Sequence, residues 1–417
     1  MPRVRELSPS VLVVLSRLGA AERGEAFREL CEAVTSLSRL FTRERETLAR
    51  KHDGLPADYL AEDTLRLGYL AYFLPVNLAK VQALLDELPA LEEATGARRS
   101  PLRVLDLGCG PGTAAVGVLD WLRHVRFGHE RPIEVVAVDR SRPALVEAER
   151  LWNEYVRLAN GPDCHLLPTH ADLERPGSLK ALASTGRAPY DLIVMANTLN
   201  ELFGAAHDPL ARRTKLVTTM LDLLAPQGSL VILEPALRDV SRDLHRVRDT
   251  LVAQQACTVY SPCLHEGPCP ALINKDDWCH EERPWTTPPL VAAIDREVGF
   301  IKDALKFSYL ILRHDGRTIV PRAAACYRVV SELREMKGEK RAWLCNETGR
   351  PEVGRLDRER SEANAALDEW HRGAIVRVEE LVRKEGKGGR GGVARIPAEA
   401  KVEMVRPVWE WQTRSVD

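Results

Sequence analysis

The stretch Arg103–Thr113, which runs RVLDLGCGPGT, decides the fold of this chain. Its apolar first half predicts a buried strand, and three alternate glycines then separate this strand from a helical pattern over 114–125. Glycines at such a junction let backbone N–H groups approach a ligand, which the N-terminus of the helix also faces. Asp106 adds an acceptor at the end of the strand. A strand, a glycine loop and a helix begin a doubly wound α/β fold, which binds ligands at the carboxyl ends of its strands.

The spacing of the glycines indicates the class of nucleotide ligand. Dinucleotide enzymes favour G-x-G-x-x-G, but this chain has G-x-G-x-G and places Thr113 where the third dinucleotide glycine would stand. An acidic residue followed by G-x-G-x-G resembles motif I of class I S-adenosylmethionine-dependent methyltransferases. The resemblance implies that the methionine part of S-adenosylmethionine is held by Asp106, Gly108, Gly110 and Gly112. The alternatives are a tight turn without a ligand and, more weakly, a nicotinamide-dependent oxidoreductase.

Two further acidic residues follow predicted strands. Residues 133–139 predict the second strand, and Asp139 at its carboxyl end either accepts the ribose hydroxyls or caps the next helix. Residues 164–167 predict a short third strand. Asp172 follows it and either accepts from the adenine amine or caps a loop.

A fourth strand is predicted at 191–195, and its nearly continuous apolar character is typical of a strand covered on both faces. It leads into ANTLNEL, residues 196–202, at the position that normally faces the transferred methyl group. This segment lacks the Asn/Asp-Pro-Pro-aromatic motif of many amino-group methyltransferases of nucleic acids. We expect Asn197 to lie near the methyl group, where positioning alone can support transfer.

Three later apolar runs complete a set of seven strands with crossover helices between them, which is the class I methyltransferase pattern. We therefore predict a Rossmann-like α/β methyltransferase domain at 99–317. Apolar residues at helical spacing predict a helical N-terminal domain at 1–98, either a cap over the sheet or a substrate-recognition lid. Residues 318–417 form a separate C-terminal region.

Composition limits the partners and the compartment. The 417 residues carry a net charge of −1, so any RNA surface must be a local patch rather than a global field. Nothing resembles a signal peptide, and the longest apolar run near the N-terminus is too short to span a bilayer. We expect a soluble, cytoplasmic monomer that binds neither membrane nor DNA.

The cysteines are unevenly placed, because four of the nine lie close together at 257, 263, 269 and 279. In a reducing compartment such a group indicates a metal site within an insertion at 257–285. The spacing C-x5-C-x9-C lacks the paired C-x2-C knuckles of zinc ribbons and suits an iron–sulfur cluster, while zinc and no metal remain alternatives. Candidates for the fourth ligand are Cys345, Cys326, Cys257, His265 and His280.

Four motifs make the chain recognisable: DLGCGPG at 106–112, ANTLNEL at 196–202, CLHEGPCP at 263–270 and DWCH at 277–280. In this order they resemble the methyltransferase-like assembly factors of the mitochondrial small ribosomal subunit and their bacterial relatives. The resemblance implies a class I methyltransferase fold, a [4Fe–4S] cluster and binding to small-subunit ribosomal RNA during assembly. It implies that the cluster ligands are Cys263, Cys269, Cys279 and Cys345, with Cys326 as the alternative fourth ligand.

Two functions are consistent with this pattern. The first is an S-adenosylmethionine-dependent methyltransferase acting on ribosomal RNA or a ribosomal protein. The second is a non-catalytic assembly factor that binds ribosomal RNA with the same fold and cluster.

The C-terminal region has two candidate RNA-binding features. A basic stretch beside Trp343 either meets phosphates and a stacked base or forms a solvated helix face; its members are Arg334, Lys337, Lys340 and Arg341. Residues 384–392 form a basic, glycine-rich loop that either wraps RNA or only closes a hairpin. Alternating residues on both sides of this loop predict a small β-unit, and residues 362–372 predict a helix.

Overall fold

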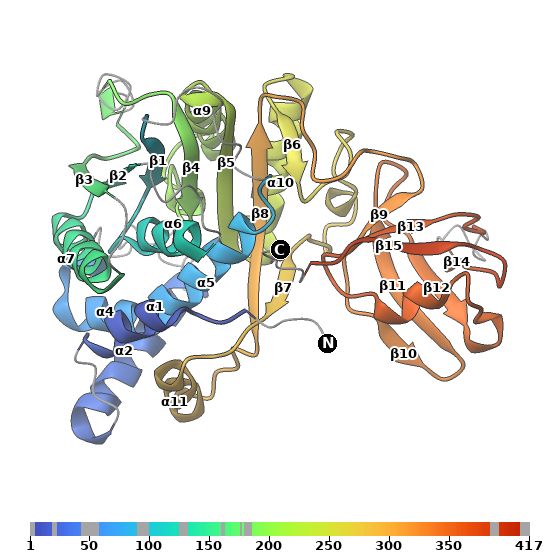
Figure 1. Cartoon of the computed structure of the whole chain (residues 1–417), viewed down its shortest axis with the longest axis horizontal. Coiled ribbons are helices and arrows are strands. Elements are labelled where there is room, and N and C mark those ends of the chain that lie inside the picture. Colours follow the sequence, from blue (N-terminus) through green and yellow to red (C-terminus); the bar gives the residue numbers. More distant parts are fainter. Residues whose placement is uncertain are drawn as a thin grey trace, which may run out of the picture.

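A central sheet of mainly parallel strands carries the glycine loop (Figure 1). The computed structural model describes residues 5–18, 23–42, 58–89, 100–124, 132–159, 163–175, 177–178, 186–383 and 392–408. The strands of the sheet are β1 (Leu102–Leu107), β2 (Ile133–Asp139), β3 (Cys164–His170), β4 (Tyr190–Ala196), β5 (Leu224–Pro235), β6 (Thr258–Ser261), β7 (Glu281–Pro284) and β8 (Ala304–Arg313). The helices around it are α6 (Thr113–His124), α7 (Arg142–Ala159), η3 (Leu199–Glu201), α9 (Pro209–Leu221), α10 (Arg238–Ala253), η4 (Pro270–Leu272) and α11 (Pro289–Val298).

The strand order is β3-β2-β1-β4-β5-β8-β6, with β8 antiparallel to both of its neighbours. This order differs from the 3-2-1-4-5-6 order of dinucleotide-binding sheets, because the last strand is inserted between β5 and β6. The prediction of seven strands is corrected to eight in the described sheet. The additional strand, β7, comes from the cysteine-rich segment and pairs with β8 in the antiparallel direction, with Glu281 opposite Phe307.

Alternating side chains of the central strands pack against helices on both faces. On β1 and β4, Val104 and Val194 join the core under α5 (Leu74–Leu85) and α6. Their neighbours Leu105 and Ile193 join a second core under α9 and α10. Burial on both faces explains why these strands are almost continuously apolar in sequence.

The N-terminal region is helical, as its periodicity predicts. Besides α5, its elements are α1 (Pro9–Ser16), α2 (Gly24–Thr42), η1 (Tyr59–Ala61), α4 (Asp63–Gly68) and η2 (Tyr69–Phe73). The segment η2 is a π-helical turn between α4 and α5, in which Leu74 N donates to Tyr69 O. It widens the helix just before Pro75, where the proline cannot donate to the ordinary helical ladder. In the part of the chain that the structure covers, no helix is both long and apolar enough to cross a membrane.

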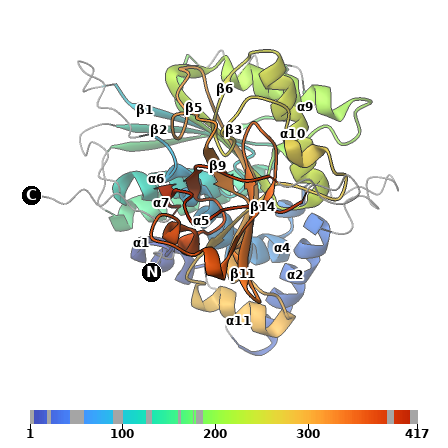
Figure 2. The ribbon, with the colours of Figure 1, turned by 90° about the vertical axis from the view of Figure 1, so that its right-hand side faces the viewer.

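The C-terminal region is a second sheet, in the order β14-β12-β11-β9-β13-β15, which Figure 2 views from its own side. Its elements are β9 (Cys326–Val329), β10 (Arg334–Met336), β11 (Glu339–Cys345), β12 (Glu352–Leu356), η5 (Asp357–Glu359), η6 (Ala365–Glu369), β13 (Ile375–Val378), β14 (Ala394–Arg395) and β15 (Val402–Arg406). The expected helix at 362–372 is therefore only the short 3-10 turn η6. The basic stretch is the hairpin β10–β11 and not a helix face.

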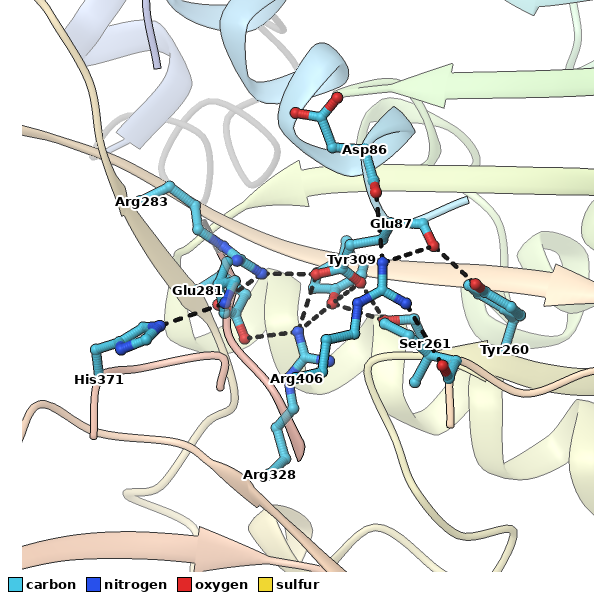
Figure 3. Close-up of polar contacts among 12 residues, drawn as sticks. Asp86, Glu87, Tyr260, Ser261, Glu281, Arg283, Tyr309, Arg328, His371 and Arg406 are labelled. Carbon is cyan, nitrogen blue, oxygen red and sulfur yellow. Dashed lines mark hydrogen bonds and ion pairs between the residues drawn. The ribbon is translucent and has the colours of Figure 1, made fainter. Parts of the chain in front are cut away.

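A buried polar group joins the C-terminal sheet to the central sheet (Figure 3). Glu87, in the turn after α5, accepts from Arg283 on β7 at 2.7 Å and from Arg328 on β9 at 3.0 Å. Tyr309 of β8 donates its hydroxyl to the same carboxylate at 2.7 Å. Burial opposes ionisation, but the charges of Arg328 and Arg283, together with the hydrogen bonds from Ser261 and Tyr309, outweigh it and lower the pKa of Glu87 to about 2. One carboxylate thus ties together a helix, the cysteine-rich segment and the C-terminal sheet.

Candidate functional site

The glycine loop between β1 and α6 has a backbone that requires glycine. Gly108 and Gly112 have φ angles of +66° and +83°, in the left-handed region. A Cβ on Gly108 would lie 2.3 Å from Thr198 Oγ1, and one on Gly112 would lie 3.0 Å from Ala148 Cβ. The loop therefore packs directly against the end of β4 and against α7, and its backbone faces the carboxyl edge of the sheet.

One carboxylate oxygen of Asp106 has no hydrogen-bond partner in the described part of the chain. Its side chain is 1% exposed, and Oδ2 accepts from the backbone N of Ala115 at 2.9 Å. Oδ1 is also buried and has no hydrogen-bond partner among the described residues. Burial raises the pKa of Asp106 to about 7. A buried acceptor without a donor is costly, so this geometry suits a ligand that brings an N–H group to the loop.

Asp139 supports the loop from the end of β2. Its Oδ2 accepts from Gly110 N at 2.8 Å, and its Oδ1 accepts from Ser141 N at 2.8 Å at the start of α7. Burial raises the pKa of this carboxyl as well. Each carboxylate oxygen has a second lone pair, so capping the helix leaves acceptor capacity for a ribose.

Asp172 lies at the same edge of the sheet, where Ala171 N donates to Asp139 O at 3.0 Å. Its carboxylate accepts from Glu174 N at 3.0 Å and lies 3.3 Å from Arg175 Nε. These contacts are those of a turn cap, which is one of the two roles expected from the sequence. Contact with an adenine stays a prediction.

The segment after β4 is fixed to the glycine loop. Asn197 has a φ of +57°, which asparagine tolerates better than most residues, and its N donates to Leu233 O at 2.7 Å. Thr198 Oγ1 donates to Leu107 O at 3.1 Å. Asn197 therefore stands at the carboxyl end of β4, beside the end of β1. Its proximity to the methyl group stays a prediction.

Residues that the sequence did not single out complete this site. Leu60 of η1 lies over the loop, with Cδ1 3.7 Å from the position of a Cβ on Gly110. Tyr59 and Tyr69 are half-buried nearby, and their phenol pKa values are raised by desolvation and by the charges of Glu201 and Asp139. The N-terminal helices thus form a wall of the loop site. The sequence gives no sign of this contact, because it depends on how the N-terminal helices pack over the glycine loop.

The four cysteines named by the resemblance lie within electrostatic range of one another. Burial raises the pKa of Cys345, and the charges of Cys279, Cys263 and Cys269 raise it further. Burial also raises the pKa of Cys279 to about 11, and Cys263 adds to that shift. The fourth thiol thus comes from β11 of the C-terminal sheet, whereas the other three come from the segment between β6 and β7.

The other residues considered as a fourth metal ligand have different surroundings. Cys326 is 2% exposed in the core that joins the two sheets. His280 pairs with Glu282 at 3.1 Å, and burial lowers the pKa of His265 to about 4. Within the described ranges, no three His, Cys, Asp or Glu side chains are grouped closely enough to hold a metal ion.

Charged residues of α10 hold the backbone of the cysteine-rich segment. Arg242 donates to the carbonyl oxygens of Ala271 and Asp277 at 3.0 and 2.7 Å. Arg248 donates to carbonyl oxygens on either side of Glu266, and Asp249 accepts from Cys269 N at 3.0 Å. The segment is therefore shaped by α10 through polar contacts to its main chain.

The C-terminal basic stretch is largely neutralised by acidic neighbours. Arg334 pairs with Glu352, and Lys340 lies 2.8 Å from Glu335 and 3.2 Å from Asp368. Arg341 also pairs with two glutamates. Trp343 is 39% exposed beside them. The arrangement favours an ion-paired surface over a phosphate-binding one. Of the basic, glycine-rich loop expected at 384–392, residues 384–391 lie outside the part of the chain that the structure describes.

Comparison with known proteins places this geometry in a family. Residues 64–356, more than half of the chain, match the family described as mitochondrial small ribosomal subunit Rsm22. The chain belongs to the Rsm22 family. The predicted resemblance to small-subunit factors is confirmed at this level. The family description is mitochondrial, so a cytoplasmic location of this Rsm22 chain stays a prediction.

The relatives of this Rsm22 chain include methyltransferases. The human citrate synthase-lysine N-methyltransferase CSKMT, mitochondrial, is 34% identical over 156 residues, which are 36% of this chain and 57% of the relative. The same protein of Pongo abelii matches to the same extent, so the chain spans little more than half the length of these relatives. The Rsm22 chain is therefore a homologue of methyltransferases.

Solved structures similar to the Rsm22 chain are also methyltransferases. A putative class I S-adenosylmethionine-dependent methyltransferase from Listeria monocytogenes is 13% identical, with a TM-score of 0.34, and the match covers 75% of this chain and 89% of that one. The CcbJ methyltransferase from Streptomyces caelestis is 20% identical, with a TM-score of 0.26, over 40% of this chain and 56% of that one. The described sheet, with β8 inserted between β5 and β6, fits a class I methyltransferase fold.

Proposed function

We propose that this Rsm22-family chain binds S-adenosylmethionine and methylates the small ribosomal subunit during its assembly. The observation that carries the proposal is the unpaired, buried Oδ1 of Asp106 beside a loop that admits only glycine at position 108. A methionine ammonium group would give that oxygen its missing donor. The small-subunit description of the family supports the ribosomal target.

In this proposal, each residue predicted to contact S-adenosylmethionine binds a particular part of that molecule. The backbone of Gly108, Gly110 and Gly112 lies against the methionine part, with Asp106. Asp139 accepts from the ribose with the lone pairs that its backbone contacts leave, and Asp172 accepts from the adenine edge. Asn197, at the end of β4, borders the methyl group and positions the acceptor.

Calorimetry with S-adenosylmethionine and a labelled-methyl assay on immature small subunits test the proposal. Donor binding followed by transfer supports a methyltransferase. Donor binding without transfer, together with binding to the subunit, supports the second candidate, a non-catalytic assembly factor. A chain that does not bind the donor at all contradicts the methyl-donor site. Asp106→Asn serves as the matched variant, because it keeps the shape of the side chain and removes its charge.

We also propose that Cys263, Cys269, Cys279 and Cys345 hold a [4Fe–4S] cluster. The charges of Cys263, Cys269 and Cys279 act on Cys345, which supports a common site. Three thiols from the segment between β6 and β7 and a fourth from β11 suit a cluster in which each thiolate binds a different iron. A single zinc ion needs four ligands around one point, a closer grouping than the described side chains have. When bound, the cluster would brace the cysteine-rich segment against β11.

Anaerobic purification tests the cluster. A brown protein with broad visible absorption and with iron and sulfide supports the proposal. A colourless protein that carries one zinc ion, or no metal, contradicts it. The metal content is independent of methyl transfer, so either result leaves the donor site to be tested separately.

A further inference from the structure

A cavity of about 560 Å³ lies beside the carboxyl ends of β4 and β5. Its wall is formed by Asn200 after β4, Glu234 at the end of β5, the first turns of α10, and Trp278 from the cysteine-rich segment. Thr198, two residues before Asn200, bonds to the end of β1 next to the glycine loop. The cavity therefore lies at the same edge of the sheet as the proposed donor site and has the size of a small-molecule pocket.

Asn200 is held in one orientation. Its backbone N donates to Glu234 Oε1 at 3.2 Å, and its side-chain Nδ2 donates to Glu234 Oε2. Its backbone O accepts from Arg213 Nη2 at 2.9 Å. Because the amide nitrogen faces a carboxylate, the amide oxygen must point away from Glu234. This Oδ1 is buried and finds no donor in the described part of the chain.

The rest of the lining includes one aromatic ring, Trp278, several aliphatic side chains and paired charges. His280 stacks on Trp278 with ring centroids 5.6 Å apart and planes 21° from parallel, which leaves the indole as a flat wall. Arg213 lies 3.2 Å from Asp243, and Arg238 lies 3.5 Å from Asp239. A neutral planar group suits such a cavity better than a charged flexible chain, since the charged side chains are already paired.

We propose that this cavity takes a nucleobase with an exocyclic amino group, with Asn200 Oδ1 accepting from the amine and the Trp278 ring stacking on the base. The identification of the cavity as the acceptor site rests on the proposed methyltransferase function. Asn200 is then a specificity-determining residue. Its Oδ1 can accept a hydrogen bond from an exocyclic amine, but it cannot accept one from the carbonyl oxygen that uracil presents at the corresponding position. Aromatic stacking adds affinity for any base, whereas the fixed acceptor discriminates among bases.

Mononucleotide binding to the full chain, saturated with S-adenosylhomocysteine, tests this proposal. The probes are the 5′-monophosphates of cytidine, adenosine and guanosine against that of uridine, followed by NMR or calorimetry. We expect at least one amino-bearing nucleotide to bind about tenfold more tightly than the uridine nucleotide. Asn200→Leu and the smaller change Asn200→Ser should remove this preference. Trp278→Leu should weaken all bases roughly tenfold.

The controls separate this inference from the proposed function. Ile273→Ala, on the same segment and 88% exposed, should change nothing. Donor affinity is measured for every variant, and values close to wild type show that the fold is intact. Normal donor binding with equal affinity for all four nucleotides, or with a Trp278→Leu variant that binds as wild type, overturns the inference alone. Tighter Trp278-dependent binding of a lysine peptide overturns it in favour of a protein substrate. Loss of donor binding in the wild-type chain overturns the proposed function instead.

Discussion

Arg328 Nη2 lies 3.0 Å from Glu87 Oε1, although the two residues are 241 positions apart in the chain. The pair connects β9 of the C-terminal sheet to the turn after α5, and Arg283 of β7 shares the same oxygen at 2.7 Å. Glu281, two residues from Cys279, lies 3.6 Å from Arg328. The ligand-bearing segment and the C-terminal sheet are therefore held together by two buried arginines that share two buried carboxylates, Glu87 and Glu281.

Glu87→Gln should destabilise the protein by about 3 kcal/mol, the lower end of the cost of breaking a buried ion pair, because it leaves two buried guanidinium groups with Glu281 as their one remaining shared carboxylate among the described residues. The change keeps the shape of the side chain, so the loss reports the charge. Urea unfolding of the full chain measures it. Glu403→Gln removes a surface carboxylate that also pairs with arginine, and it should change stability by less than about 0.5 kcal/mol. Equal effects of the two substitutions would contradict a special role of Glu87.

Acid should remove the same stabilisation. The folded-state pKa of Glu87 is about 2, below its ordinary value of 4.5, so its contribution is fully present above about pH 5 and is lost as pH falls toward 2. The difference between these two pKa values corresponds to about 3 kcal/mol of unfolding free energy. Unfolding free energies measured between pH 7 and pH 3 should therefore fall more steeply for the wild type than for Glu87→Gln. Parallel curves would show that other carboxylates control acid unfolding.

Gly108→Ala should abolish donor binding. Its Cβ would lie 2.3 Å from Thr198 Oγ1 at a left-handed φ, so both the loop and the segment after β4 would have to move. Gly316→Ala is the matched control, because Gly316 has a φ of +75° and open space around the new Cβ. It should cost about 1–2 kcal/mol of stability and leave donor affinity unchanged. Calorimetry with S-adenosylhomocysteine distinguishes the two.

The local features of this fold could be predicted from the sequence, and the features that depend on distant partners could not. The glycine loop and the strands of the central sheet follow from short apolar runs and from the spacing of three glycines. Strand β7 was not predicted, because its residues, EERP, are mostly charged. They pair with β8, which follows only after the intervening helix α11. The buried position of Glu87 could not be predicted either, since both of its arginine partners come from segments far along the chain.

The candidate site divides in the same way. The sequence predicts that Asp106 and Asp139 lie at one edge of the sheet, because both follow parallel strands and ligands bind at the carboxyl ends of such strands. No role for Asn200 follows from the sequence, because its orientation depends on Glu234 in another strand. Trp278 appears in the sequence only as part of the motif DWCH, next to Cys279. Its position in the cavity depends on how α10 holds the backbone of the cysteine-rich segment.

Donor affinity should depend on pH through Asp106. Burial raises its pKa to about 7, and an ammonium-bearing donor prefers the ionised carboxylate, so affinity should weaken as pH falls below 7. Asp106→Asn should lower affinity about tenfold at pH 8, the scale of a hydrogen bond to a charged group, and remove most of the pH dependence. Calorimetry from pH 6 to pH 8.5 measures both. A variant that keeps the wild-type pH profile would assign the titration to another group.

Cys345→Ser should lose bound iron, whereas Cys326→Ser should keep it. Both residues lie in strands of the C-terminal sheet, but only Cys345 is coupled electrostatically to Cys263, Cys269 and Cys279. Cys326 is packed in an apolar core instead, so its serine variant should lose some stability without losing metal. Iron and sulfide are determined after anaerobic purification, and visible absorption is recorded beside them. If the Cys326 variant is colourless and the Cys345 variant is brown, the fourth ligand comes from β9 and the proposed ligand set is wrong.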